Sequence, residues 1–128
     1  MEIPADLKYS KEHEWVRVEG KIAVIGITDH AQEQLGDVVM VEIPAEGTVV
    51  TKDETFGVVE SVKAVSDIFA PISGKIVEIN EPVAESPGIL NEDCYGEGWL
   101  VKVEISKPGD LEDLMSAQAY EAYLKESS

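Results

Sequence analysis

A single lysine, Lys63, stands in the middle of the segment ESVKAVSD, residues 60–67. Alternating apolar and polar residues on both sides of it, in TFGVVES and AVSDIFA, predict a β-hairpin with the lysine at or next to its tip. A lysine there offers a long flexible stem and an amine that can be acylated once it loses its proton. Loops on rigid scaffolds commonly carry function. The first hypothesis is therefore a modification site, where an amide bond would place a cofactor on a mobile tether.

The neighbours of Lys63 separate this hypothesis from the alternative of an ordinary solvated turn lysine. Val62 is apolar although the turn is expected to be exposed, which suggests that another protein contacts it. Ser61 and Ala64 are small and leave the amine open to approach. Position alone does not distinguish the two interpretations, so the hypothesis depends on the block as a whole.

Composition narrows the classes of partner. The chain has 128 residues, which fits one domain with its own core. Its 26 acidic and 10 basic residues give a formal net charge of −16. Such a surface repels phosphate backbones and anionic lipids, so we expect no nucleic-acid and no membrane binding. It favours partners with basic docking faces, although an acidic surface can also serve only to prevent aggregation.

The single cysteine, Cys94, excludes an internal disulfide and a cysteine-rich metal site. No apolar run approaches the length of a membrane span, and no leader pattern precedes the domain. We therefore expect a cytoplasmic protein; a mitochondrial matrix protein whose leader was removed stays open. His13 and His30 lie in different segments without metal-site spacing, so we expect structural roles for both.

The elements that must position the lysine are mainly β. Strand-like segments separated by turn residues run from about residue 15 to 105, and WVRVEG with KIAVIGI predicts a hairpin near Glu19-Gly20. TDHAQEQLG predicts a helix with Thr28 as N-cap and Gly36 as C-terminal stop. A second helix is expected over about 110–125, with Asp110 as its N-cap and a stripe of apolar residues on one face.

A weak internal repeat suggests an approximate two-fold arrangement. A shift of 38 positions overlays GDVVMVEIP, residues 36–44, on GKIVEINEP, residues 74–82. A shift of 39 overlays Phe56-Gly57 on Tyr95-Gly96. Two copies cannot build a solenoid. They could build a barrel or sandwich, although chance similarity between β-rich segments would give the same matches.

Five blocks, in the same order, resemble the glycine cleavage system H protein family. They are KYSKEHEWV, VIGITDHAQEQLGDVVMVEIP, ESVKAVSD, APISGKIVEIN and NEDCYGEGWLVKV. The resemblance covers essentially the whole chain. Two positions depart from the family pattern: Cys94 stands where proline is usual, and Val65 is bulkier than the residue expected after the alanine.

The resemblance implies a non-catalytic carrier in one domain, residues 1–128. Its fold would be a lipoyl-type barrel-sandwich hybrid of two small antiparallel sheets, with an N-terminal hairpin, one short internal helix and a C-terminal helix. Lipoic acid would be attached covalently to Lys63, within the modification motif formed by Glu60, Ser61, Val62 and Ala64.

The implied partners are those of the glycine cleavage cycle. They are a pyridoxal-phosphate-dependent glycine decarboxylase, a tetrahydrofolate-dependent aminomethyltransferase, dihydrolipoamide dehydrogenase and the lipoylating enzymes. The arm would shuttle the aminomethyl group of glycine and then reducing equivalents between them. A carrier that several enzymes must reach is most simply a monomer.

An aminomethylated arm would carry a cationic amine, which carboxylates on the body could hold through charge-assisted hydrogen bonds. Glu14 and Asp67 are the candidates, with Glu60 third. For each, the alternative is an ordinary surface acid or a turn-stabilising group.

Other classes of function stay open at this point. An H-like protein acting mainly as a lipoate donor would use the same Lys63. A biotinyl domain usually flanks its lysine with methionines, whereas Val62 and Ala64 stand here, and a dehydrogenase lipoyl domain lacks the HEW hairpin and the GITDHAQ helix. An enzyme with its own acid–base chemistry and a purely structural binding module are the remaining alternatives.

Overall fold

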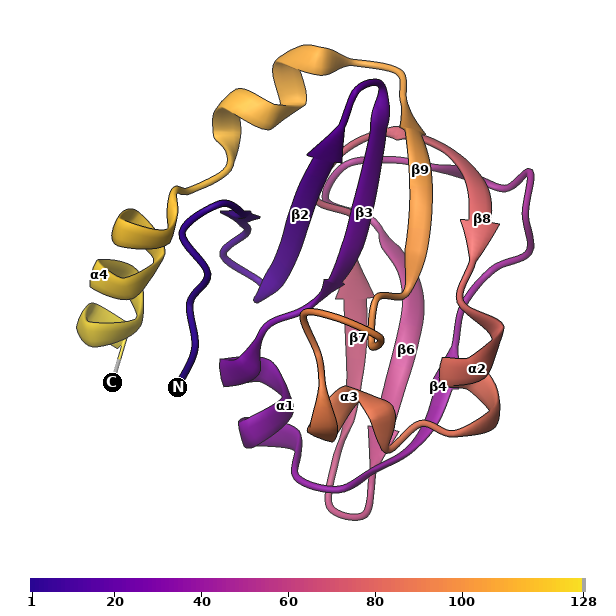
Figure 1. The fold of residues 1–128 in the computed structure, drawn as a ribbon, viewed down its shortest axis with the longest axis vertical. Helices are drawn as coiled ribbons and strands as arrows, with labels where there is room; N and C mark the ends of the chain where they lie inside the picture. Colours follow the sequence, from indigo (N-terminus) through magenta and orange to yellow (C-terminus); the bar gives the residue numbers. More distant parts are fainter. Residues whose placement is uncertain (128) are drawn as a thin grey trace.

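Across residues 1–127, the part of the chain that the computed structural model describes, the strands form two antiparallel sheets (Figure 1). The larger has six strands, in the order β1 (Lys8–Tyr9), β2 (Glu14–Glu19), β3 (Ile22–Ile27), β9 (Val101–Ile105), β8 (Gly74–Ile79) and β5 (Val49–Val50). The smaller has three, in the order β4 (Val38–Glu42), β6 (Thr55–Ser61) and β7 (Val65–Phe69). The predicted mainly β, two-sheet fold is confirmed, and one sheet is larger than expected because the N-terminal hairpin extends it.

Both hairpins predicted from the sequence are present. β2 and β3 pair up to Glu19 and Ile22, and the turn between them uses Gly20 at a positive φ of 64°. Only glycine adopts this conformation without steric cost. β6 and β7 pair up to Glu60 and Val65, which leaves a short tip containing Lys63.

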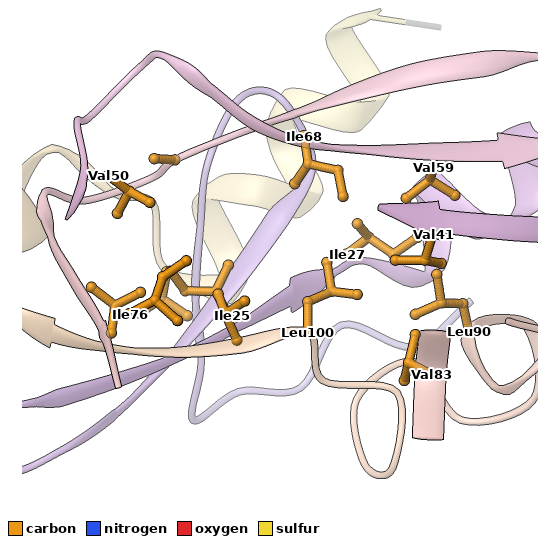
Figure 2. Packing of buried hydrophobic residues seen from close by; sticks show 14 of the residues in the cluster. Ile25, Ile27, Val41, Val50, Val59, Ile68, Ile76, Val83, Leu90 and Leu100 are labelled. Carbon is orange, nitrogen blue, oxygen red and sulfur yellow. The ribbon is translucent and has the colours of Figure 1, made fainter. Parts of the chain in front are cut away.

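The core lies between the two sheets, and its residues come from the inward faces of strands in both (Figure 2). Ile25 and Ile27 project from β3, while Val59 and Ile68 project from β6 and β7. All four are at least 96% buried, which stabilises the fold by about 1.5–3 kcal/mol for each side chain. The β6–β7 hairpin is thus fixed to the body by its inward residues.

The predicted first helix is confirmed as α1 (Asp29–Leu35). The Thr28 hydroxyl accepts a hydrogen bond from the Ala31 amide at 3.2 Å, and Gly36 ends the helix with φ at 77°. The other helical segments are α2 (Glu81–Glu85), α3 (Ile89–Glu92), the 3-10 helix η1 (Pro108–Asp113) and α4 (Ala117–Ser127).

The expected C-terminal helix is confirmed as α4, but its predicted start at Asp110 is wrong. η1 and α4 are separate, because the backbone of Met115 pairs with that of Tyr9 through two hydrogen bonds of 2.7 and 2.8 Å. This bridge requires extended backbone at a position where the helix would have continued. Asp110 does not cap a helix; its Oδ2 accepts a hydrogen bond from the Ser73 amide at 2.9 Å instead.

The first overlay of the internal repeat corresponds to a shared irregularity in the two sheets. The β4–β6 pairing shifts register between Val38 and Met40, and the β8–β9 pairing shifts between Ile76 and Glu78. These positions are 38 apart, as the repeat predicts. The two sheets therefore contain related bulged strands.

The second overlay does not correspond. Phe56-Gly57 lies inside β6, whereas Tyr95-Gly96 lies in the turn segment before β9. The strands that pair with the two bulged strands, β6 and β9, correspond at other positions. Val59 of β6 lies opposite Val41, and Val101 of β9 lies opposite Ile79, which is 38 positions after Val41.

Candidate functional site

Lys63 is exposed at the tip of the β6–β7 hairpin, at the end of the molecule near α1 and α3 (Figure 1). Ser61 closes the tip: its amide donates to the Ala64 carbonyl at 2.8 Å, and its hydroxyl oxygen accepts from the Ala64 amide at 3.0 Å. The same hydroxyl lies 3.3 Å from the Lys63 amide. Ser61 is therefore buried and stabilises the turn through hydrogen bonds, whereas the sequence indicated only that it is small.

Val62 is on the surface, as the sequence predicted, and so is Val65. The side chains of Val62 and Val65 are 71% and 67% exposed. Exposed valines on both sides of a lysine provide apolar surface that another protein can contact when it handles the amine.

The tip rests on the chain between α1 and β4. The Val62 amide donates to the Asp37 carbonyl at 3.1 Å. The stem of Lys63 runs over Gly36, where a Cβ atom would lie 3.3 Å from Cε of the lysine. Because Gly36 has no side chain, the stem can pass close to the backbone there.

Glu14, the first residue of β2, is buried beside the end of the β6–β7 hairpin that lies opposite the Lys63 tip, with only 2% of its surface exposed. Its Oε1 accepts a hydrogen bond from the Ser10 hydroxyl at 2.5 Å, and its Oε2 accepts one from the Phe69 amide at 3.2 Å. Burial raises the pKa of the Glu14 carboxyl from 4.5 to about 8, although these two hydrogen bonds partly oppose the shift. The sequence named this residue, but nothing in it indicated the burial.

A pocket of about 280 Å³ opens beside the Glu14 carboxyl. Four parts of the chain line it: the segment that leads into β2, the turn between β5 and β6, the end of β7 with the residues that follow, and the end of η1. An ion pair of 2.7 Å between Lys52 and Asp113 joins two of these parts. The lining residues are Ser10, Lys11, Glu12, Glu14, Lys52, Asp53, Phe69, Ala70, Pro71, Asp113 and Leu114.

Asp67 and Glu60 do not line this pocket. Asp67 lies on β7 opposite Val58, exposed on the outer face of the three-stranded sheet. Glu60 is half-buried on β6, opposite Val65. Of the three candidate carboxylates, only Glu14 combines burial with an adjacent cavity.

The histidines have structural partners in the described chain. Nδ1 of His13 lies 2.8 Å from the Tyr120 hydroxyl, which in turn lies 2.8 Å from the Thr28 hydroxyl. The ring of His30 lies 4.6 Å from that of His13, and burial together with this neighbour lowers the pKa of His13. In residues 1–127 no cluster of three or more histidine, cysteine or acidic side chains could hold a metal ion.

Cys94 is buried, and its carbonyl accepts a hydrogen bond from the indole N–H of Trp15 at 2.9 Å. Burial raises the pKa of its thiol to about 12, so the thiolate that would exchange with a disulfide is scarce at neutral pH. No described helix is long and apolar enough to cross a membrane.

The two-sheet body, with an exposed lysine at the tip of a tight hairpin, is suited to a carrier domain. Comparison with known proteins identifies the family. The family model for the glycine cleavage H-protein matches residues 7–127. The chain belongs to this family and is the carrier protein of the glycine cleavage system.

Individual relatives agree over nearly their full length. The chain is 59% identical over 126 residues to the glycine cleavage system H protein of Anaeromyxobacter sp. strain K, covering 98% of both chains. It is 58% identical over 124 residues to that of Symbiobacterium thermophilum, covering 97% of both. The crystal structure of the H protein from Mycobacterium marinum superposes with a TM-score of 0.89 at 38% identity, covering 95% of this chain and 98% of that one.

Proposed function

We propose that Lys63 is the attachment site of lipoic acid, held by an amide bond between its Nζ and the lipoyl carboxyl group. The supporting observation is the position of this amine, exposed at a hairpin tip that Ser61 closes and Gly36 supports. When bound, lipoate supplies a disulfide that accepts the aminomethyl group and later carries electrons. The protein's own contribution is to present the arm on a rigid body and to shelter its end.

We propose that the pocket beside Glu14 shelters the loaded end of the arm. Ala64 and β7 separate Lys63 from this pocket, and the five residues of β7 span about 13 Å. An extended lipoyl-lysine is long enough to cover such a strand. Ser10 and the Phe69 amide hold the Glu14 carboxyl in place, and a cationic amine placed against it would gain a charge-assisted hydrogen bond.

Protonation of Glu14 would control this docking. With a pKa of about 8, the carboxyl is mostly neutral at pH 7 before the amine of the arm docks. An ammonium group at hydrogen-bonding distance would favour the charged form and lower that pKa. Docking of the amine would thus release a proton from Glu14 and would strengthen as the pH rises toward 8.

The partners follow from the same proposal. We infer a monomeric, non-catalytic carrier in the cytoplasm that meets the glycine decarboxylase, the aminomethyltransferase, dihydrolipoamide dehydrogenase and a lipoylating enzyme in turn. The net charge of −16 favours basic docking faces on those enzymes. The exposed Val62 and Val65 give each of them apolar contact beside the lysine.

Mass spectrometry of the intact chain and its peptides, made in cells able to lipoylate, tests the attachment site. We expect one lipoyl adduct that maps to Lys63 and is absent from Lys63→Arg. A biotin adduct would refute the cofactor while keeping the tethered arm. An unmodified lysine, beside a known lipoyl substrate modified in the same cells, would refute the arm itself.

Loss of the aminomethyl group from the isolated, loaded protein tests the pocket. We expect Glu14→Gln to speed this loss at least about tenfold, because a charge-assisted hydrogen bond contributes roughly 1.5–3 kcal/mol. Asp67→Asn, which removes an exposed charge from the same hairpin, measures the effect of charge alone. Equal loss rates in the wild type and Glu14→Gln would refute the docking role.

A further inference from the structure

The side chain of Asn91, in α3, holds a segment of chain more than 50 positions away. Its Oδ1 accepts a hydrogen bond from the Val38 amide at 2.9 Å, and its Nδ2 donates to the Gly36 carbonyl at 2.8 Å. The same Nδ2 donates to the side-chain oxygen of Gln32, in α1, at 3.0 Å. Asn91 therefore fixes both ends of the short connection between α1 and β4.

The opposite side of that connection supports the lysine. The carbonyl of Asp37, between the two residues that Asn91 binds, accepts the hydrogen bond from the Val62 amide. The stem of Lys63 passes over Gly36, where a Cβ would lie 3.3 Å from Cε of the lysine, closer than ordinary van der Waals contact. The connection of residues 36–38 thus lies between Asn91 on one side and the lysine-bearing tip on the other.

The internal shape of the tip does not depend on Asn91. The bonds that close it run within residues 61–64, from Ser61 to Lys63 and Ala64. What residues 36–38 determine is the direction in which the closed tip points relative to the body. A mobile support would leave the turn intact while letting the amine sample many directions.

We propose that Asn91 is a positioning residue for Lys63, acting through residues 36–38 to hold the amine in the direction from which it is lipoylated. This inference rests on the proposed attachment of lipoate at that lysine. An enzyme that acylates an amine requires it within a narrow range of positions, and small misplacements lower such rates strongly. Asn91, which is distant from Lys63 in the sequence, therefore affects the lipoylation reaction through residues 36–38 without contacting the reacting amine.

Asn91 also satisfies a carbonyl at the C-terminal end of α1, so a purely structural role predicts a loss of stability and nothing more. Asn80 provides the matched control. It is a buried asparagine whose Nδ2 donates to two backbone carbonyls, those of Glu97 and Trp99, at 2.7 and 2.6 Å. Its partners belong to the segment before β9 and not to the support of the tip.

The experiment compares Asn91→Ala with Asn80→Ala in two measurements. The first is kcat/KM for lipoylation by a purified lipoate-attaching enzyme with lipoate and ATP, at a temperature where both variants are folded. The second is hydrogen exchange of the Val62 amide, which reports its bond to Asp37. We expect Asn91→Ala to lower kcat/KM about tenfold and to speed Val62 exchange about tenfold, and Asn80→Ala to change neither.

A second pair of variants tests the face of residues 36–38 that meets Lys63, with a control at a distant glycine. Gly36→Ala and Gly20→Ala place a side chain at similar positive φ values of 77° and 64°, but only the first meets Lys63. We expect Gly36→Ala alone to slow lipoylation. This pair, and Asn91→Asp, which keeps the acceptor for the Val38 amide and loses both donated hydrogen bonds, keep the test decisive if Asn91→Ala does not fold.

Wild-type lipoylation kinetics and unchanged Val62 exchange in a folded Asn91 variant would overturn the inference. Equal losses in the Asn91 and Asn80 variants would overturn it too, because they would show a general effect of stability. If the wild type accepts no lipoate, the proposed attachment fails, and hydrogen exchange still decides whether Asn91 holds the tip.

Discussion

Replacing Glu14 by glutamine should change how the stability of the unmodified protein depends on pH. The pKa of this carboxyl rises from 4.5 to about 8 on folding, because the side chain is buried. Each pKa unit corresponds to about 1.4 kcal/mol, so the full linkage is about 5 kcal/mol. A raised folded-state pKa means that the folded protein binds the proton more tightly. The stabilisation is therefore complete below about pH 4.5 and is lost as the pH rises through about 8.

Urea unfolding followed by tryptophan fluorescence, repeated across pH, measures this effect. Between about pH 5 and about pH 8 the wild type should lose about 3 kcal/mol more stability than Glu14→Gln, which has no proton to lose there. Glu46→Gln removes the same charge from an exposed side chain outside the pocket, and it reports the effect of charge alone. A difference between the wild type and Glu14→Gln that stays within about 1 kcal/mol across this range would refute the burial argument.

Two further predictions concern buried groups outside the site. The thiol of Cys94 should react with a disulfide reagent at least about 100-fold more slowly in the native protein than in urea, because it is buried with a pKa raised to about 12; rapid native labelling, read as released thiolate absorbance, would contradict this. Thr28→Val should lower the free energy of unfolding by about 1–2 kcal/mol, because it removes both the cap on the Ala31 amide and the bond to the Tyr120 hydroxyl; an unchanged urea midpoint would show that neither bond contributes.

The features that the sequence predicted well are those with local causes. Thr28 and Gly36 bound a helix through contacts within a few residues, and the alternation on both sides of Lys63 forms the hairpin that it indicates. The predicted start of the C-terminal helix was wrong because a long-range bridge between Met115 and Tyr9 interrupts an apolar pattern that is otherwise suited to a helix. Local pattern cannot show that a distant strand competes for the backbone.

The site was predictable in its chemistry and not in its environment. The block around Lys63 identified the lysine, and the sequence offered three candidate carboxylates, Glu14, Asp67 and Glu60. Burial separates them: Glu14 is enclosed by segments up to about 100 positions away in the chain, whereas Asp67 is exposed. No pattern in the sequence indicated a role for Asn91, because the proposed role depends on three hydrogen bonds to residues 53 to 59 positions away.

β7 connects the proposed attachment site, Lys63, with the proposed pocket beside Glu14. β7 begins two residues after Lys63, and its last residue, Phe69, donates its amide to the Glu14 carboxyl. Ile68, buried between the sheets, fixes the register of that strand, since a slip by one residue would turn it outward. The distance from the lysine to the carboxyl is therefore set by a paired strand and not by a flexible loop. A tether of fixed length can then reach the pocket in one conformation and leave it in others, which is what a carrier that both protects and delivers its cargo requires.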